Sequence, residues 1–79
     1  MNKLDEETAT WLCKRFKLKR DDIAWFHSGI CYDRICVATK EAADKVTEAV
    51  KGQSVNGGCY DGMTLGYQSK TENGYEVMC

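Results

Sequence analysis

Hydrophobic residues recur at helical spacing near the start of the chain. Four of them fall on one side of a helix and form its expected core stripe: Ala9, Leu12, Cys13 and Phe16. Acidic residues precede this stripe and basic residues follow it, an order that complements the helix dipole. The pattern predicts a helix from Asp5 to Lys17 or Leu18. Its expected N-cap is Asp5 or Asn2.

The segment "KEAADKVTEAVK" carries a second helical stripe, and its opposite face is uniformly polar. The apolar side consists of Ala42, Ala43, Val46, Ala49 and Val50. Thr39 stands at the N-cap position, and Gly52 stands where glycine commonly follows a helix. We therefore predict a helix between Thr39 and Gly52 that packs one side against a sheet.

Four other segments have the alternation or the residue types of β-strands. They are Asp22–Phe26, Cys31–Thr39, Met63–Ser69 and Tyr75–Cys79. The sequences "HSG" and "KTENG" predict turns within two hairpins, and Gly52–Gly62 is expected to be a loop, with a brief strand inside it as an alternative. In the second strand, Ile35 and Val37 share one face and Cys36 lies on the other.

The predicted order of elements is α-β-β-α-β-β. Its simplest packing is an α+β two-layer sandwich, in which a four-stranded antiparallel sheet carries both helices on one face. The chain has 79 residues, enough for one small core, so residues 1–79 are expected to form a single small α+β domain. This architecture leaves the second face of the sheet open.

The first predicted helix also carries apolar residues outside its core stripe. Leu4, Trp11 and Leu18 recur at seven-residue steps on the opposite side. Two interpretations remain open: Trp11 lies on the shoulder of a broad core stripe, or Trp11 and Leu18 are exposed and contact a partner. Exposed Trp beside Arg is typical of interface hot spots. The candidate partner-binding residues are therefore Trp11, Arg15, Leu18 and Lys14.

Charge and cysteine content limit the classes of function. A net charge of −1 argues against a binder of nucleic acid with a globally basic field. The five cysteines are an odd number, and "MNKLDEETATWL" lacks the apolar core of a secretory signal. No stretch approaches the roughly 18 apolar residues of a membrane span. We expect reduced thiols, a cytoplasmic location and no membrane contact.

Candidate catalytic and metal-binding residues are few. His27 is the only histidine, and its spacing to Cys31 and Asp33 matches no nucleophile motif. A zinc site would have to draw on His27, Cys31, Cys36 and Cys59, without the paired C-x2-C spacing of such sites. The glycines of the long loop form no phosphate-binding motif. The sequence therefore predicts no enzymatic activity, no metal and no cofactor.

An RNA- or DNA-binding module is the alternative function. The run "CKRFKLKR" gives a basic end to the first helix, with candidate contacts Lys14, Arg15, Lys17, Lys19 and Arg20. Aromatic residues on or near the strands suit base stacking. However, the strands carry almost no basic residue beyond Arg34, and a basic run is more often a solvated helix end. Nucleic acid is therefore the weaker alternative.

The sheet offers two further routes to association. Aromatic residues left over on the open face would form a patch that favours a partner. The terminal strand Tyr75–Cys79, placed at a sheet edge, would lack the proline or lysine that usually protects an edge. Pairing of such edges would give a homodimer.

The favoured function is non-enzymatic binding of another protein. Small chains without a catalytic constellation often act as inhibitors or adaptors by steric occlusion. Phage and mobile-element proteins that block host defence complexes, anti-CRISPR proteins among them, are of this kind in size and style. The basic residues would then steer toward an acidic surface of a host complex. The sequence leaves open the identity of the partner, the oligomeric state and which sheet face is exposed.

Overall fold

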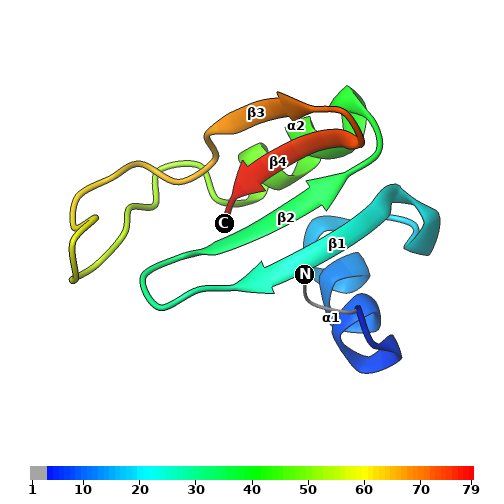
Figure 1. The fold of residues 1–79 in the computed structure, drawn as a ribbon, viewed down its shortest axis with the longest axis horizontal. Coiled ribbons are helices and arrows are strands. Elements are labelled where there is room, and N and C mark those ends of the chain that lie inside the picture. Colours follow the sequence, from blue (N-terminus) through cyan, green and yellow to red (C-terminus); the bar gives the residue numbers. More distant parts are fainter. Residues whose placement is uncertain (1–3) are drawn as a thin grey trace.

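A computed structural model describes residues 4–79, and these residues form a sheet backed by helices. The elements are α1 (Glu6–Phe16), a 3-10 turn η1 (Arg20–Asp22), β1 (Ile23–Ser28), β2 (Asp33–Val37), α2 (Lys40–Ala49), β3 (Gln68–Thr71) and β4 (Gly74–Met78). The strands pair antiparallel in the order β1-β2-β4-β3, and both helices lie behind the sheet in Figure 1. The predicted α-β-β-α-β-β order and two-layer α+β architecture are confirmed.

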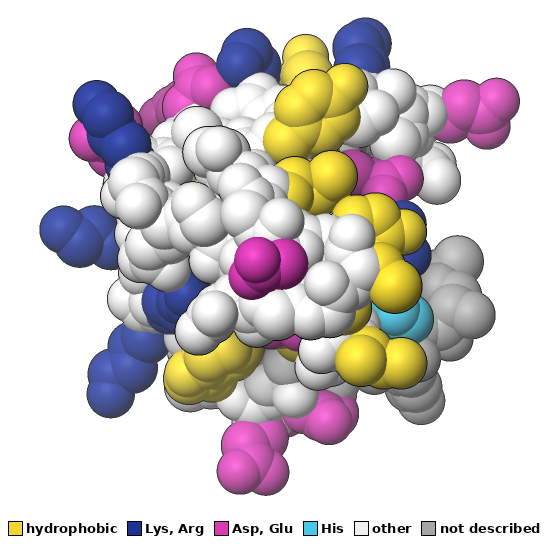
Figure 2. All heavy atoms as spheres, turned by 90° about the vertical axis from the view of Figure 1, so that its left-hand side faces the viewer, with side chains coloured by type: hydrophobic (Ala, Val, Ile, Leu, Met, Phe, Trp, Pro, Cys, Tyr) yellow, Lys and Arg dark blue, Asp and Glu magenta, His cyan; other side chains and the backbone are white. Residues whose placement is uncertain are grey.

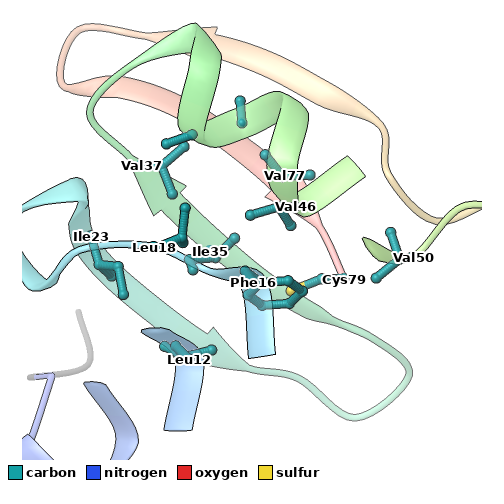
Figure 3. Close-up of a cluster of buried hydrophobic side chains, with 12 residues drawn as sticks. Leu12, Phe16, Leu18, Ile23, Ile35, Val37, Val46, Val50, Val77 and Cys79 are labelled. Carbon is teal, nitrogen blue, oxygen red and sulfur yellow. The ribbon is translucent and has the colours of Figure 1, made fainter. Parts of the chain in front are cut away.

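Side chains from both layers meet in one hydrophobic cluster (Figure 3). Its members are Leu12, Phe16, Leu18, Ile23, Ile35, Val37, Ala42, Ala43, Val46, Val50, Val77 and Cys79. Ile35 and Val77 are direct cross-strand partners, so the central strands β2 and β4 present the same face to the helices. In the part of the chain that the structure describes, no helix is long and apolar enough to cross a membrane.

Helix α1 begins where its capping residue predicts. The Asp5 carboxylate accepts a hydrogen bond of 2.7 Å from the backbone N–H of Thr8. This bond stabilises the charged form, so the pKa of the Asp5 carboxyl lies below its ordinary value. Asn2, the other candidate cap, lies outside the described residues.

The end of α1 corrects the prediction for Leu18. Lys17 takes the left-handed conformation with φ of 57°, and the backbone N–H groups of Lys17 and Leu18 both donate to the carbonyl of Cys13. This turn carries Leu18 back into the core, where only 7% of its surface is exposed (Figure 3). The predicted exposure of Leu18 is wrong, because the seven-residue spacing from Trp11 places two side chains on one face only within a continuous helix.

We expect Lys17→Gly to raise the free energy of unfolding by about 0.5–1 kcal/mol. Lysine at positive φ brings its Cβ close to the backbone, whereas glycine adopts the same conformation without that contact. Urea denaturation of the two proteins measures the difference. Lys17→Ala is the matched control, since it removes the same side chain but keeps the Cβ. Equal stability of the glycine and alanine variants would show that this turn is not strained.

Helix α2 follows its prediction at the start and ends early. The Thr39 hydroxyl accepts a hydrogen bond of 3.1 Å from the backbone N–H of Ala42, as the N-cap position predicts. The helix ends at Ala49, and Gly52 takes a φ of 83° in the turn beyond it. Ala49 is exposed and does not belong to the buried stripe.

The first hairpin turns later than predicted. Strand β1 continues through His27 to Ser28, so the connection spans residues 29–32 and the "HSG" turn is wrong in position. Strand β2 is correspondingly shorter than Cys31–Thr39. The alternation along β2 was predicted correctly, because Ile35 and Val37 belong to the core cluster on the side of the helices.

The third predicted strand is displaced along the chain. Met63–Ser69 is mostly loop, and β3 covers Gln68–Thr71. Gly62 and Gly66 have φ values of 87° and 96°, which interrupt an extended strand. Residues 53–65 instead fold onto themselves, with a hydrogen bond of 2.8 Å from the Val55 N–H to the Met63 carbonyl. This loop projects to the left in Figure 1.

Strand β4 occupies the interior of the sheet. It pairs with β2 on one side and with β3 on the other, so the edges are β1 and β3. The prediction that Tyr75–Cys79 forms an unprotected edge is therefore wrong, and edge-to-edge dimerisation through it loses its basis. The edge strand β3 carries Lys70, a residue type that disfavours edge pairing.

Candidate interaction surface

Trp11 is exposed yet held in place. It keeps 48% of its surface exposed on helix α1. Its ring meets that of Phe26 edge to face, with centroids 6.2 Å apart and planes at 76°. The guanidinium carbon of Arg15 lies 5.5 Å from the indole centroid. The two interpretations of the sequence are thus both partly correct, because Trp11 sits at the border of the core and still presents half of its surface to solvent.

Arg15 stacks on two rings of its own helix. Its guanidinium carbon lies 4.9 Å from the centroid of Phe16 in addition to the contact with Trp11. The ion pairs found among residues 4–79 do not include Arg15. The side chain is exposed, as is that of Lys14. Of the four candidate partner-binding residues, Trp11, Arg15 and Lys14 share the exposed side of α1, and Leu18 does not.

The five residues proposed as nucleic-acid contacts are all exposed: Lys14, Arg15, Lys17, Lys19 and Arg20. A sixth basic residue reaches the same end of α1 from helix α2. The Lys45 ammonium donates a hydrogen bond of 3.4 Å to the carbonyl of Lys17. Sequence reasoning missed Lys45, because 28 residues separate the two and only packing of the helices brings them together.

A hollow of about 370 Å³ opens between the two helices. We call it the α1–α2 hollow. Its lining consists of Arg15, Phe16, Lys17, Lys45, Glu48 and Ala49. In Figure 2, Lys and Arg side chains stand along the left margin, which is the side of the molecule that carries the helices. The basic surface therefore belongs to the helix layer and includes residues of both helices.

A second exposed apolar region lies at the opposite end of the fold, around the first hairpin and the long loop. Its exposed large side chains include Ile30, Tyr60 and Met63. Tyr60 packs edge to face on Tyr32, with centroids 5.4 Å apart, and both rings border a hollow of about 830 Å³. Figure 2 looks onto this end and shows hydrophobic side chains running down to the histidine. Sequence reasoning missed Ile30, because a lone isoleucine in a turn gives no periodic signal.

The helix-free face of the sheet is less apolar than predicted. Cys36 lies on this face between Trp25 and Glu76 of the neighbouring strands, and only 1% of its surface is exposed. Arg34 and Glu76 form an ion pair of 3.5 Å beside it. Burial raises the pKa of the Cys36 thiol. An ion pair in the middle of this face interrupts any continuous hydrophobic patch.

His27, Cys31 and Cys59 border one hollow, whereas the sheet separates His27 from Asp33. Ser28 is the direct partner of Asp33, so His27 points to the face opposite Asp33. Within residues 4–79, no group of three His, Cys, Asp or Glu side chains converges as a metal ion would require. The cysteines also differ in setting, since Cys36 and Cys79 are buried and Cys59 is exposed.

Comparison with known proteins adds no relative. No protein-family model, no curated protein and no solved structure matches this chain. The function is therefore argued from the surface alone, and the two features that bear on it are the fixed indole of Trp11 and the basic residues around it.

Proposed function

We propose that this protein is a non-enzymatic binding module that attaches to another protein through Trp11, Arg15 and Lys14. The observation that carries the proposal is the exposed indole held between Arg15 and Phe26. A large aromatic side chain with a fixed orientation loses little conformational freedom on binding. Tryptophan and arginine are also the residue types that contribute most to interface affinity.

The proposed mode of action is steric occlusion, as in a small inhibitor or adaptor. A standard interface buries about 800 Å² on each partner, which is roughly a seventh of the 5339 Å² surface of this chain. The bound module, with extents of 31 × 25 × 22 Å, would then stand in the way of other macromolecules at that place. No chemical step is needed for such inhibition.

Capture of a partner from host-cell lysate tests the proposal. We expect a protein partner that survives nuclease treatment and binds Trp11→Ala about 30-fold more weakly, the typical cost of losing an interface hot spot. Tyr67→Ala is the matched control, because Tyr67 is another exposed aromatic residue but lies beside β3, away from α1. Circular dichroism of both variants checks that each remains folded.

Two results would contradict the proposed surface. A partner held equally well by Trp11→Ala would move the interface to another region, such as the exposed Ile30 and Tyr60. A partner whose capture is lost after nuclease treatment would favour the nucleic-acid alternative, which is supported by the exposure of the five basic residues from Lys14 to Arg20. That alternative also predicts a steep fall of affinity with added salt, measured by anisotropy of a labelled oligonucleotide.

A further inference from the structure

The guanidinium of Arg15 is arranged for a planar acceptor. The guanidinium carbon lies over the rings of Trp11 and Phe16, at 5.5 and 4.9 Å from their centroids, and contacts with two rings restrain the group. Stacking uses the faces of a guanidinium and leaves its N–H donors at the edge. A fixed fork of donors pairs with a carboxylate through two parallel hydrogen bonds. Arg15 therefore presents a preformed receptor for a carboxylate.

Two lysines complete the basic border of the α1–α2 hollow. One donor of the Lys45 ammonium is directed to the carbonyl of Lys17, which holds this charge at the end of α1. Lys17 itself borders the same hollow. Among the described residues, neither lysine forms an ion pair with an acidic side chain. Three positive charges thus remain available to one ligand.

The other parts of the hollow restrict what that ligand is. Phe16, only 2% exposed, and Ala49 give it an apolar wall, which suits the methylene stem of a Glu side chain. Glu48 borders the same space and offsets part of its positive charge. The apolar wall favours carboxylates on methylene stems over the phosphates of a nucleic-acid backbone.

We infer that the α1–α2 hollow binds an acidic segment of the partner protein, with one carboxylate on Arg15 and its neighbour between Lys17 and Lys45. The inference rests on the proposed function and adds the chemistry of the partner. Because Arg15 touches both Trp11 and the hollow, the two form one continuous surface. The segment bound there would carry acidic residues next to an apolar group that packs on Trp11.

The test uses hexaglutamate as a probe and isotope-labelled full-length protein. We expect shifts of the backbone amides of Phe16, Lys45 and Ala49 to report binding. Lys45→Glu should weaken the affinity about fivefold, the scale of one solvent-exposed ion pair. Lys51→Glu is the matched control, since it makes the same charge change in the turn after α2, outside the lining of the hollow. Hexalysine should cause no shifts at these positions.

Arg15→Lys separates geometry from charge. It keeps the positive charge but loses the planar fork, so a carboxylate receptor is expected to lose about as much affinity as in Lys45→Glu. Equal binding by the wild type, Arg15→Lys and Lys45→Glu would overturn the inference. So would a short oligonucleotide that displaces hexaglutamate and binds more tightly, because the ligand would then be a phosphate chain.

The outcomes for the hollow and for the proposed function are distinguishable. Hexaglutamate binding is measured on the isolated protein, whereas partner capture by Trp11→Ala needs no acidic peptide. If Trp11→Ala loses the partner and hexaglutamate does not bind, only the inference that the hollow binds an acidic segment would be refuted. The proposed function would stand. If hexaglutamate binds specifically and Trp11→Ala captures the partner unchanged, the hollow would still be a carboxylate-binding site. The proposed role of the indole in binding the partner would then be refuted.

Discussion

Leu18→Ala is expected to lower the free energy of unfolding by about 3 kcal/mol, within the range measured for buried leucines. Leu18 lies in the central cluster, and the truncated side chain would leave a cavity bordered by both layers. A domain of this size has a small margin of stability, so the loss is a large fraction of the total. Urea denaturation at unchanged m-value measures the effect.

Trp11→Ala is the matched comparison. Its indole is half exposed and contacts the core by one ring edge, so we expect a loss of only about 1 kcal/mol. The sequence placed Leu18 and Trp11 on one face of the helix. The two variants would then show that Leu18 is needed for the fold, whereas Trp11 is available for binding. A Leu18→Ala protein as stable as the wild type would contradict the burial of Leu18.

The parts of the fold that follow local rules could be predicted from the sequence. Both helices were located by their stripes and by the capping residues Asp5 and Thr39, because each cap bonds to a backbone N–H three residues ahead. The order of elements follows in the same way from local periodicity. Neither prediction depended on contacts between distant parts of the chain.

The errors arose where one residue or a distant contact decides the structure. The turn after α1 depends on Lys17, and no glycine marks it in the sequence. The alternation of Met63, Leu65 and Tyr67 predicts a strand, but Gly66 and the bond between Val55 and Met63 hold this segment in a loop. The interior place of β4 is set by pairing across the sheet, which local patterns do not encode.

The candidate surface likewise combines features that local sequence rules predict with features that depend on distant contacts. The contact of Trp11 with Arg15 follows from four-residue spacing on a helix and was foreseeable, whereas the exposure of Trp11 was one of two interpretations that the sequence left open. The hollow beside them was not, because it needs Lys45 from a helix that begins more than twenty residues later. Helix packing alone determines which lysines join the basic end of α1.

Raising the pH above about 9 is expected to destabilise the protein through Cys79. Burial, with a further contribution from the nearby Asp33 carboxylate, raises the pKa of the Cys79 thiol from 9.0 to about 12. Between these values the unfolded chain has lost the proton and the folded chain still binds it, so stability falls as pH rises. The slope is about 1.4 kcal/mol per pH unit, and the full loss approaches about 4 kcal/mol. Below the lower value the thiol is protonated in both states and contributes no pH dependence.

Urea denaturation under reducing conditions, at pH values from about 8 to about 11, measures this slope. Cys79→Ala removes the ionisable group and should flatten the pH dependence, whereas Cys59→Ala, which changes an exposed cysteine, should leave it in place. All other ionisable side chains except Cys59 are common to the three proteins, so the difference between the slopes isolates Cys79. The buried Cys36, whose pKa is also raised, keeps a residual slope of the same sign in the Cys79→Ala protein. Identical slopes for the wild type and Cys79→Ala would mean that the thiol of Cys79 is solvated and ionises as readily in the folded protein as in the unfolded chain.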